Sequence, residues 1–297
     1  MFGTLLGALP RPPLPADAPF EAIVDACLEL QAEHGLEPAT DGGWTEARGD
    51  LVASWQATAG RADRLVKAVV VGPFSSGRSE AEVRADVVRL GEAGCRWIEV
   101  HEPAAVSIGE AADRRARFAE AHQALTRDLG SDLHLSLAIT GGNADTAGID
   151  TILAGAYSSV ALDLIDGPEN WRLAVAVPTE RGVVCGALSA HPRSDDGPET
   201  LLWAARYAAG SKGRGVARVG LATSGSMREL SWDEAATKVR RLGDAVRIAS
   251  MPTEAQRAAI DPRAVDARSA ALGRVEPRRA APLETRRSDS PGDPTDA

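Results

Sequence analysis

Lysine and long apolar runs are scarce in this sequence, and each shortage excludes a class of protein. Only three of the 33 basic residues are lysine, and the formal net charge is -9. An acidic chain lacks the basic surface that nucleic acid or an anionic membrane requires, so we expect neither as a partner. No apolar run approaches the roughly 20 residues that cross a bilayer. The sequence predicts a soluble protein that acts on a small molecule, and it leaves the oligomeric state open.

Cysteine is equally rare. Cys27, Cys95 and Cys185 lie far apart without C-x-x-C spacing, so neither a disulfide framework nor a zinc knuckle is indicated. Such usage fits a reducing compartment. The opening MFGTLLGALP has no basic region before its apolar residues and therefore does not resemble a secretory signal. We expect a cytoplasmic protein.

Short apolar runs alternate with longer helical stretches along most of the chain. This βα alternation is typical of a parallel sheet, and about eight such runs are the number that closes a TIM barrel. The fold prediction is therefore an α/β protein, a TIM (β/α)8 barrel over residues 1–251. The predicted strands are GTLLGAL, LEPAT, LVKAVVVG, CRWIEVH, LHLSLAIT, VALDLI, GVVCGALS and RVGLAT.

Helix boundaries are marked by capping residues. Ser79 with Glu82, and Ser231 with Glu234, have the spacing of a capping box at a helix start. Gly94 follows the first of these helices, where glycine commonly ends a helix. A third amphipathic helix is predicted around residues 20–34.

Residues 252–297 form a separate region. They are rich in Pro, Arg, Asp and Ser and contain few large apolar groups. Such a segment buries too little surface to offset the entropy of ordering, so we expect a disordered C-terminal tail.

If the barrel prediction holds, a functional site lies at the carboxyl ends of the strands. The stretch WIEVHEP ends one predicted strand with His101, a potential general base, and Pro103 stops the ladder. Glu99 shares the strand face of His101. Glu102 points to the opposite face, where it is expected to tie the loop by capping or by pairing with an arginine.

Other ionisable residues follow further strands. Arg11 and Asp41 come after the first two and are candidates for binding a carboxylate and an amine, respectively. Asp163 and Cys185 lie near the ends of two later strands. Together with His101 and His191 they offer the ligand types of a zinc site, although no pair has a short ligand spacing. The alternatives are a hydrogen-bonded cap at the rim for His101, rim salt bridges for Arg11 and Asp41, and a small buried apolar side chain for Cys185.

Several strand ends resemble the cobalamin-independent methionine synthase family, whose barrels share a superfamily with uroporphyrinogen decarboxylase. LLGALPRP resembles the family's GS-x-PR turn, GLEPATDGG its strand ending in D-G-E, and AGCRWIEVHEPA its AG-C-x-x-I-Q-x-DEPA segment. VVVGPF, VALDLIDGPENW and the stretch from VGLATSGS to KVRRL match later segments in order. The resemblance spans about residues 6–249.

The resemblance implies methyl transfer from a folate to a thiol that zinc holds as thiolate, as in methionine biosynthesis. The family's zinc-binding histidine and cysteine fall on Ser136 and Ala138, and its last cysteine falls on Val219. The family also has a carboxylate ligand on the next strand, and Asp163 is the one residue here that matches a family ligand. The glutamate of D-G-E is Gly43, and the aspartate of DEP is His101. Alanine and valine cannot bind zinc, so we expect no metal site of the family type.

The sequence therefore predicts a methionine synthase-like barrel of the methyltransferase class that does not carry out ordinary zinc-dependent methionine synthesis. A folate-type donor and a small thiol or amino-acid-like acceptor are implied by the resemblance. The predicted catalytic residues are His101 and Asp163, and the substrate-binding residues are Arg11, Asp41, Glu99, Ser136 and Cys185. Two alternatives remain. One is a metal-free decarboxylase or lyase that uses His101 and Asp163, and the other is a barrel that binds a ligand without catalysis.

Overall fold

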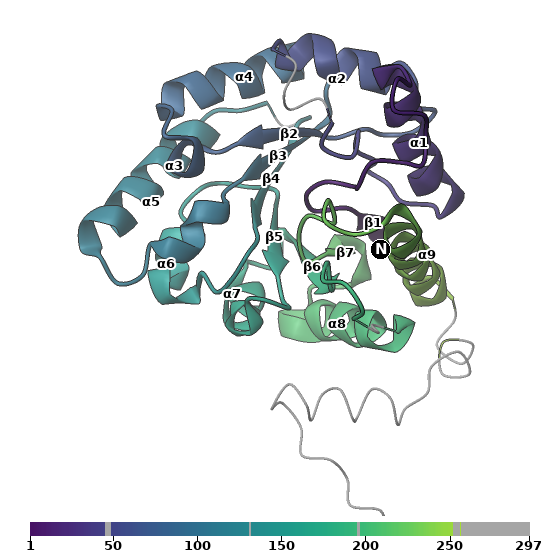
Figure 1. The fold of residues 1–297 in the computed structure, drawn as a ribbon. Coiled ribbons are helices and arrows are strands. Elements are labelled where there is room, and N and C mark those ends of the chain that lie inside the picture. The colour runs from purple at the N-terminus through teal and green to yellow at the C-terminus, as the bar shows by residue number, and fades with distance from the viewer. Residues whose placement is uncertain (45–48, 131, 195–196, 252–255, 257–297) are drawn as a thin grey trace, which may run out of the picture.

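The structure is a computed structural model that describes residues 1–44, 49–130, 132–194, 197–251 and 256. Seven parallel strands form one curved sheet, part of a barrel, with helices on its outer side (Figure 1). The strand order is β1-β7-β6-β5-β4-β3-β2. The strands are β1 (Phe2–Thr4), β2 (Ala68–Val71), β3 (Trp97–His101), β4 (His134–Ile139), β5 (Ser159–Asp163), β6 (Gly182–Leu188) and β7 (Val219–Thr223).

The helices alternate with these strands, as the sequence predicts. They are α1 (Phe20–Glu33), α2 (Leu51–Ala59), α3 (Pro73–Ser76), α4 (Glu80–Glu92), α5 (Ala112–Thr126), α6 (Ile149–Ile152), α7 (Trp171–Ala176), α8 (Pro198–Gly210) and α9 (Trp232–Ala249). None of the helices in the described part of the chain is both long enough and apolar enough to cross a membrane. The predicted tail, 252–297, lies outside the described residues apart from Gln256.

One predicted strand is missing. Residues 36–40 make a single parallel bridge, between Ala39 and Val66, in place of the expected eighth strand. The segment still bonds to both edges of the sheet, because Glu37 N–H donates to Gly3 O at 2.8 Å and Lys67 N–H donates to Ala39 O at 2.9 Å. Pro38 has no N–H to donate, which limits the ladder that this segment can form.

The two faces of the sheet bury different side chains. Large residues such as Ile98, Leu137 and Leu221 pack outward against the helices in the main core. The inner face carries a smaller cluster in which three of the five buried members are alanine. Its members are Leu6, Ala138, Ala161, Val184 and Ala222, with Phe2 packed against them. Short inner side chains fit the limited space inside a curved sheet.

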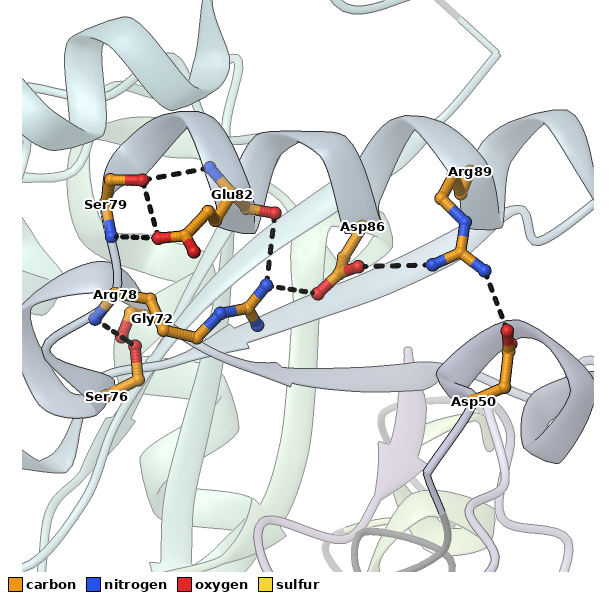
Figure 2. Close-up of polar contacts among 8 residues, drawn as sticks. All are labelled: Asp50, Gly72, Ser76, Arg78, Ser79, Glu82, Asp86 and Arg89. Atoms are coloured by element: carbon orange, nitrogen blue, oxygen red, sulfur yellow. Dashed lines mark hydrogen bonds and ion pairs between the residues drawn. The ribbon is translucent and has the colours of Figure 1, made fainter.

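The predicted capping boxes are both confirmed. Ser79 and Glu82 exchange side-chain and backbone hydrogen bonds at the start of α4, and Ser231 and Glu234 do so at the start of α9. Gly94, with φ of +98°, follows α4 as expected. Figure 2 shows that the exposed face of α4 continues as a chain of ion pairs from Arg78 through Asp86 and Arg89 to Asp50 at the start of α2.

Glu102 holds the segment that follows β2. Its carboxylate accepts hydrogen bonds from the N–H groups of Phe74 and Ser75, at 2.9 and 2.7 Å. The expected capping role of Glu102 is thus confirmed. An added Cβ at Gly72 would overlap the Glu102 carboxylate, so only glycine permits this close approach.

Gly72→Ala is therefore expected to destabilise the protein by about 2 kcal/mol or more, through overpacking and loss of the Glu102 hydrogen bonds. Gly210→Ala is the matched control, because Gly210 also has a negative φ and nothing lies within 4 Å of its added Cβ. Its effect on the free energy of unfolding should stay within about 1 kcal/mol. Urea unfolding of both variants tests this, and equal stabilities would contradict the role given to Gly72.

Candidate functional site

The carboxyl ends of the parallel strands lie at the same edge of the sheet, which we call the mouth. It contains His101 at the end of β3, Thr140 after β4, Asp163 at the end of β5 and Thr223 at the end of β7. Three of these four side chains are buried and His101 is half-buried. Polar groups from distant parts of the chain therefore gather where parallel-sheet proteins place their active sites.

His101 is the most accessible ionisable group of this set. Its Nε2 lies 2.8 Å from Thr140 Oγ1, so the two residues share a hydrogen bond. Burial lowers the pKa of His101, an effect that the nearby Glu99 opposes and Lys67 reinforces. Burial thus favours the neutral imidazole. If Nε2–H donates to Thr140, Nδ1 is free to accept a proton.

A buried ion pair lies on the inner face of the sheet near His101. Lys67 Nζ is 2.6 Å from Glu99 Oε2 and donates a second hydrogen bond to Leu5 O at 2.8 Å. Their side chains are 0% and 3% exposed, respectively. Sequence reasoning included Glu99 but missed Lys67. A lysine inside the apolar run LVKAVVVG was the available signal, since a buried lysine requires a partner.

Ser136 lies beside Glu99, because the two residues are paired in the register of β3 and β4. It shares its face of β4 with Ala138, which belongs to the inner cluster. Ser136 is 1% exposed, and within the described residues its hydroxyl has no hydrogen-bond partner. An unsatisfied buried hydroxyl indicates a place for a water molecule or for a polar group of a ligand.

Asp163 is fully buried and its carboxylate is engaged with the backbone. It accepts hydrogen bonds from Gly141 N–H at 3.0 Å, Ile165 N–H at 2.9 Å and Asp166 N–H at 3.0 Å. Burial raises its pKa, while these hydrogen bonds act in the opposite direction. The contacts show that Asp163 ties together the loops that follow β4 and β5. Its catalytic role stays a prediction.

Two other predicted binding residues stabilise loops. The exposed Arg11 donates from Nη2 to the carbonyls of Pro15 and Ala16, at 3.0 and 3.2 Å. The half-buried Asp41 accepts from Gly43 N–H at 2.9 Å. These contacts leave substrate binding by either residue as a prediction.

Cys185 does not lie at the mouth. It is fully buried in the main core, on the helix side of β6, whereas its neighbour Val184 belongs to the inner cluster. The sequence placed Cys185 near the end of a strand but did not fix its face, and successive strand residues point to opposite faces. Its position agrees with the alternative, a small buried apolar side chain. Burial raises the pKa of Cys185 to about 12, so it has no thiolate character.

The structure gives no support to a relocated zinc site. His191 is exposed and pairs with Asp166, with Nε2 and Oδ1 2.7 Å apart. Within the described residues, no three His, Cys, Asp or Glu side chains lie close enough together to hold a metal ion. The positions that match the family's zinc ligands do not fit zinc either. Ser136 and Ala138 lie on β4 beside Glu99 and His101, and Val219 begins β7. Alanine and valine have no atom that can bind the metal.

A second buried network was not foreseen from the sequence. His122 on α5 lies with Nε2 3.1 Å from Glu102 Oε1 and with Nδ1 2.5 Å from Tyr157 Oη. All three side chains are buried. His122 had no sequence signal beyond its place on a helix, because its partners are 20 and 35 residues away. The network supports Glu102 and, through it, the segment after β2.

Comparison with known proteins identifies the fold. No family model matches the sequence, and the curated proteins give no match. A B12-independent methionine synthase from Shewanella sp. W3-18-1, solved with selenomethionine, superposes with a TM-score of 0.69 at 13% identity, covering 82% of this chain and 97% of that one. A putative B12-independent methionine synthase from Listeria monocytogenes gives 0.65 at 10% identity, covering 84% and 98%.

Other barrels match less well. A putative deoxyribose-phosphate aldolase from Toxoplasma gondii ME49 gives a TM-score of 0.51 at 14% identity, covering 83% of this chain and 94% of that one. At these identities the likeness shows the fold alone. The fold is that of the methionine synthase-like barrels, in agreement with the resemblance found in the sequence.

The buried ion pair gives a direct prediction. Lys67→Met or Glu99→Leu leaves one buried charge without its partner and is expected to cost about 3–5 kcal/mol of stability. The double variant removes both charges and should be less destabilised than either single variant. Denaturant unfolding of all three forms tests the coupling, and additive losses would show that the two side chains do not interact as described.

Stability should also depend on pH through two half-buried histidines, His101 and His134. Burial lowers the pKa of His101, and it lowers that of His134 from 6.5 to about 4. Both folded values lie below the unfolded one, so the unfolded chain takes up protons first, and this contribution to stability is lost as the pH falls from about 6.5 toward 4. His134→Gln should reduce the loss between pH 7 and 5, as measured by urea unfolding. An unchanged pH dependence would contradict the assignment.

Proposed function

We propose that this protein is a methionine synthase-like enzyme of the methyltransferase class that takes a small thiol or amino-acid-like acceptor at the mouth. The observation that carries the proposal is the His101 imidazole at the mouth, bonded to Thr140 and lying near the Lys67–Glu99 pair. The likeness to two methionine synthase-like barrels supports the class. In this proposal residues 36–40 complete the wall of the barrel between β1 and β2.

The proposed chemistry replaces zinc by a base. A thiol with a pKa near 8.5 is mostly protonated at neutral pH, and a neutral imidazole can accept its proton. The thiolate then forms the S–CH₃ bond as the N–CH₃ bond of a folate-type donor breaks. The proton held by His101 is delivered to the donor nitrogen that loses the methyl group, so the step balances. Ser136 gives the acceptor a hydroxyl near Glu99 to hydrogen-bond.

A decarboxylase or lyase is the second candidate. His101 at the mouth favours it, because an imidazole can transfer a proton without a metal, and the buried Lys67–Glu99 pair lies nearby. Lys67 has three N–H groups, and two of them are accounted for by Leu5 and Glu99. The two candidates differ in the ligand that they require.

Ligand-dependent melting separates the candidates. Methyltetrahydrofolate together with homocysteine should raise the melting temperature of the full chain by a few degrees, whereas a porphyrin carboxylate should not. A shift with the porphyrin alone would favour the second candidate. No shift with either ligand would indicate a barrel without this function.

His101 can then be tested by kinetics. His101→Gln retains a hydrogen-bonding group toward Thr140 but cannot act as a base. It should lower the rate of methyl transfer about 10²–10⁴-fold and change acceptor affinity little. Ser136→Ala should mainly weaken acceptor binding. Wild-type rates in His101→Gln would contradict the proposed mechanism.

A further inference from the structure

A pocket outside the mouth has features that the proposed function does not use. It lies where α3, the start of α4 and α5 meet, and Figure 1 shows these helices on the outer side of β2 and β3. The cavity has a volume of about 320 Å³. We call it the α3 pocket. Its lining consists of Pro73, Phe74, Gly77, Arg78, Ser79, Glu80, Arg117 and Ala121.

An aromatic ring gives the pocket an apolar surface. Phe74 packs edge-on against the buried Phe118, with ring centroids 5.6 Å apart. The guanidinium carbons of Arg114 and Arg117 lie 5.6 and 5.2 Å from the Phe74 ring centroid. The backbone at Phe74 is held by Glu102, which accepts the Phe74 N–H at 2.9 Å. The α3 pocket thus has an ordered apolar wall beside two cations.

Its three charged lining residues differ in their partners. Arg78 is engaged: Nη2 contacts Asp86 Oδ2 at 2.8 Å and Glu82 O at 3.2 Å, as Figure 2 shows. Within the described residues, neither Arg117 on α5 nor Glu80 on α4 takes part in an ion pair. One cation and one anion, on different helices and both exposed, therefore line the same cavity without an ion-pair partner among the described residues.

We propose that the α3 pocket binds a free α-amino acid as its zwitterion. Arg117 binds the carboxylate, Glu80 binds the ammonium group, and the apolar side chain packs on Phe74 and Ala121. Arginine suits a carboxylate because its planar N–H groups can donate in parallel. The zwitterion can contact both charged side chains, which a plain anion or a plain amine cannot do. The site is independent of the function proposed for the mouth.

Three ligands of matched shape test the charge requirement. Norleucine carries both groups, hexanoate lacks the amine, and 1-aminopentane lacks the carboxylate. In ligand-observed NMR titrations of the full chain, norleucine should bind in the millimolar range expected for so small a ligand, and the other two at least tenfold more weakly. Hexanoate binding as tightly as norleucine would show an anion site and overturn the proposal. So would the absence of saturation by norleucine.

Substitutions locate the binding. Arg117→Ala and Glu80→Gln should each weaken norleucine binding about tenfold or more. The controls Arg240→Ala on α9 and Glu92→Gln at the far end of α4 change exposed residues outside the pocket and should leave it unchanged. His101→Ala separates the α3 pocket from the mouth. Binding lost with His101→Ala but retained in Arg117→Ala would place norleucine at the mouth and refute the α3 site, whereas failure of the methyltransferase proposal would leave the Arg117 dependence intact.

Discussion

The ion pair of Lys67 and Glu99 is the constraint on which the interior of this sheet depends. Two charges removed from water must be close to each other and hydrogen-bonded, and here a 2.6 Å contact and the carbonyl of Leu5 meet that condition. The inner cluster on the same face of the sheet is built largely of alanine, which has no polar group to offer either charge. The pair also acts on His101, since Glu99 raises its pKa and Lys67 lowers it.

The residues at the mouth differ from the zinc ligands of the family that the sequence resembles. In the family that the sequence resembles, zinc keeps a thiol ionised. At the matching positions this chain has a serine, an alanine and a valine, none of which provides a nitrogen or sulfur ligand. It has instead a neutral imidazole at the end of β3, held by Thr140. In the mechanism that we propose, His101 takes the proton, and Asp163 holds the two neighbouring loops.

Local sequence signals predicted much of the fold, but they could not predict contacts between segments that are distant in the sequence. The capping boxes at Ser79 and Ser231 depend on residues three apart, and both formed as expected. Seven strands appeared near their predicted positions, but the segment containing Pro38 formed only one bridge.

Candidate side chains were harder to place than strands. Cys185 follows the expected strand but faces the helices, because the two faces of a fully buried strand are both apolar and the sequence does not show which face is inner. Lys67 was overlooked because its value as a site residue depends on Glu99, 32 positions away. His122 and Tyr157 were missed for the same reason, since only folding brings them to Glu102.

The most direct test of the central claim, that the mouth works without a zinc-bound thiolate, is metal analysis of the purified full chain after equilibration with excess zinc and dialysis. We expect well under one zinc per chain, and the same zinc content in Asp163→Ala. A full equivalent of zinc that is held by protein side chains and lost on substitution of Asp163 or His101 would contradict it.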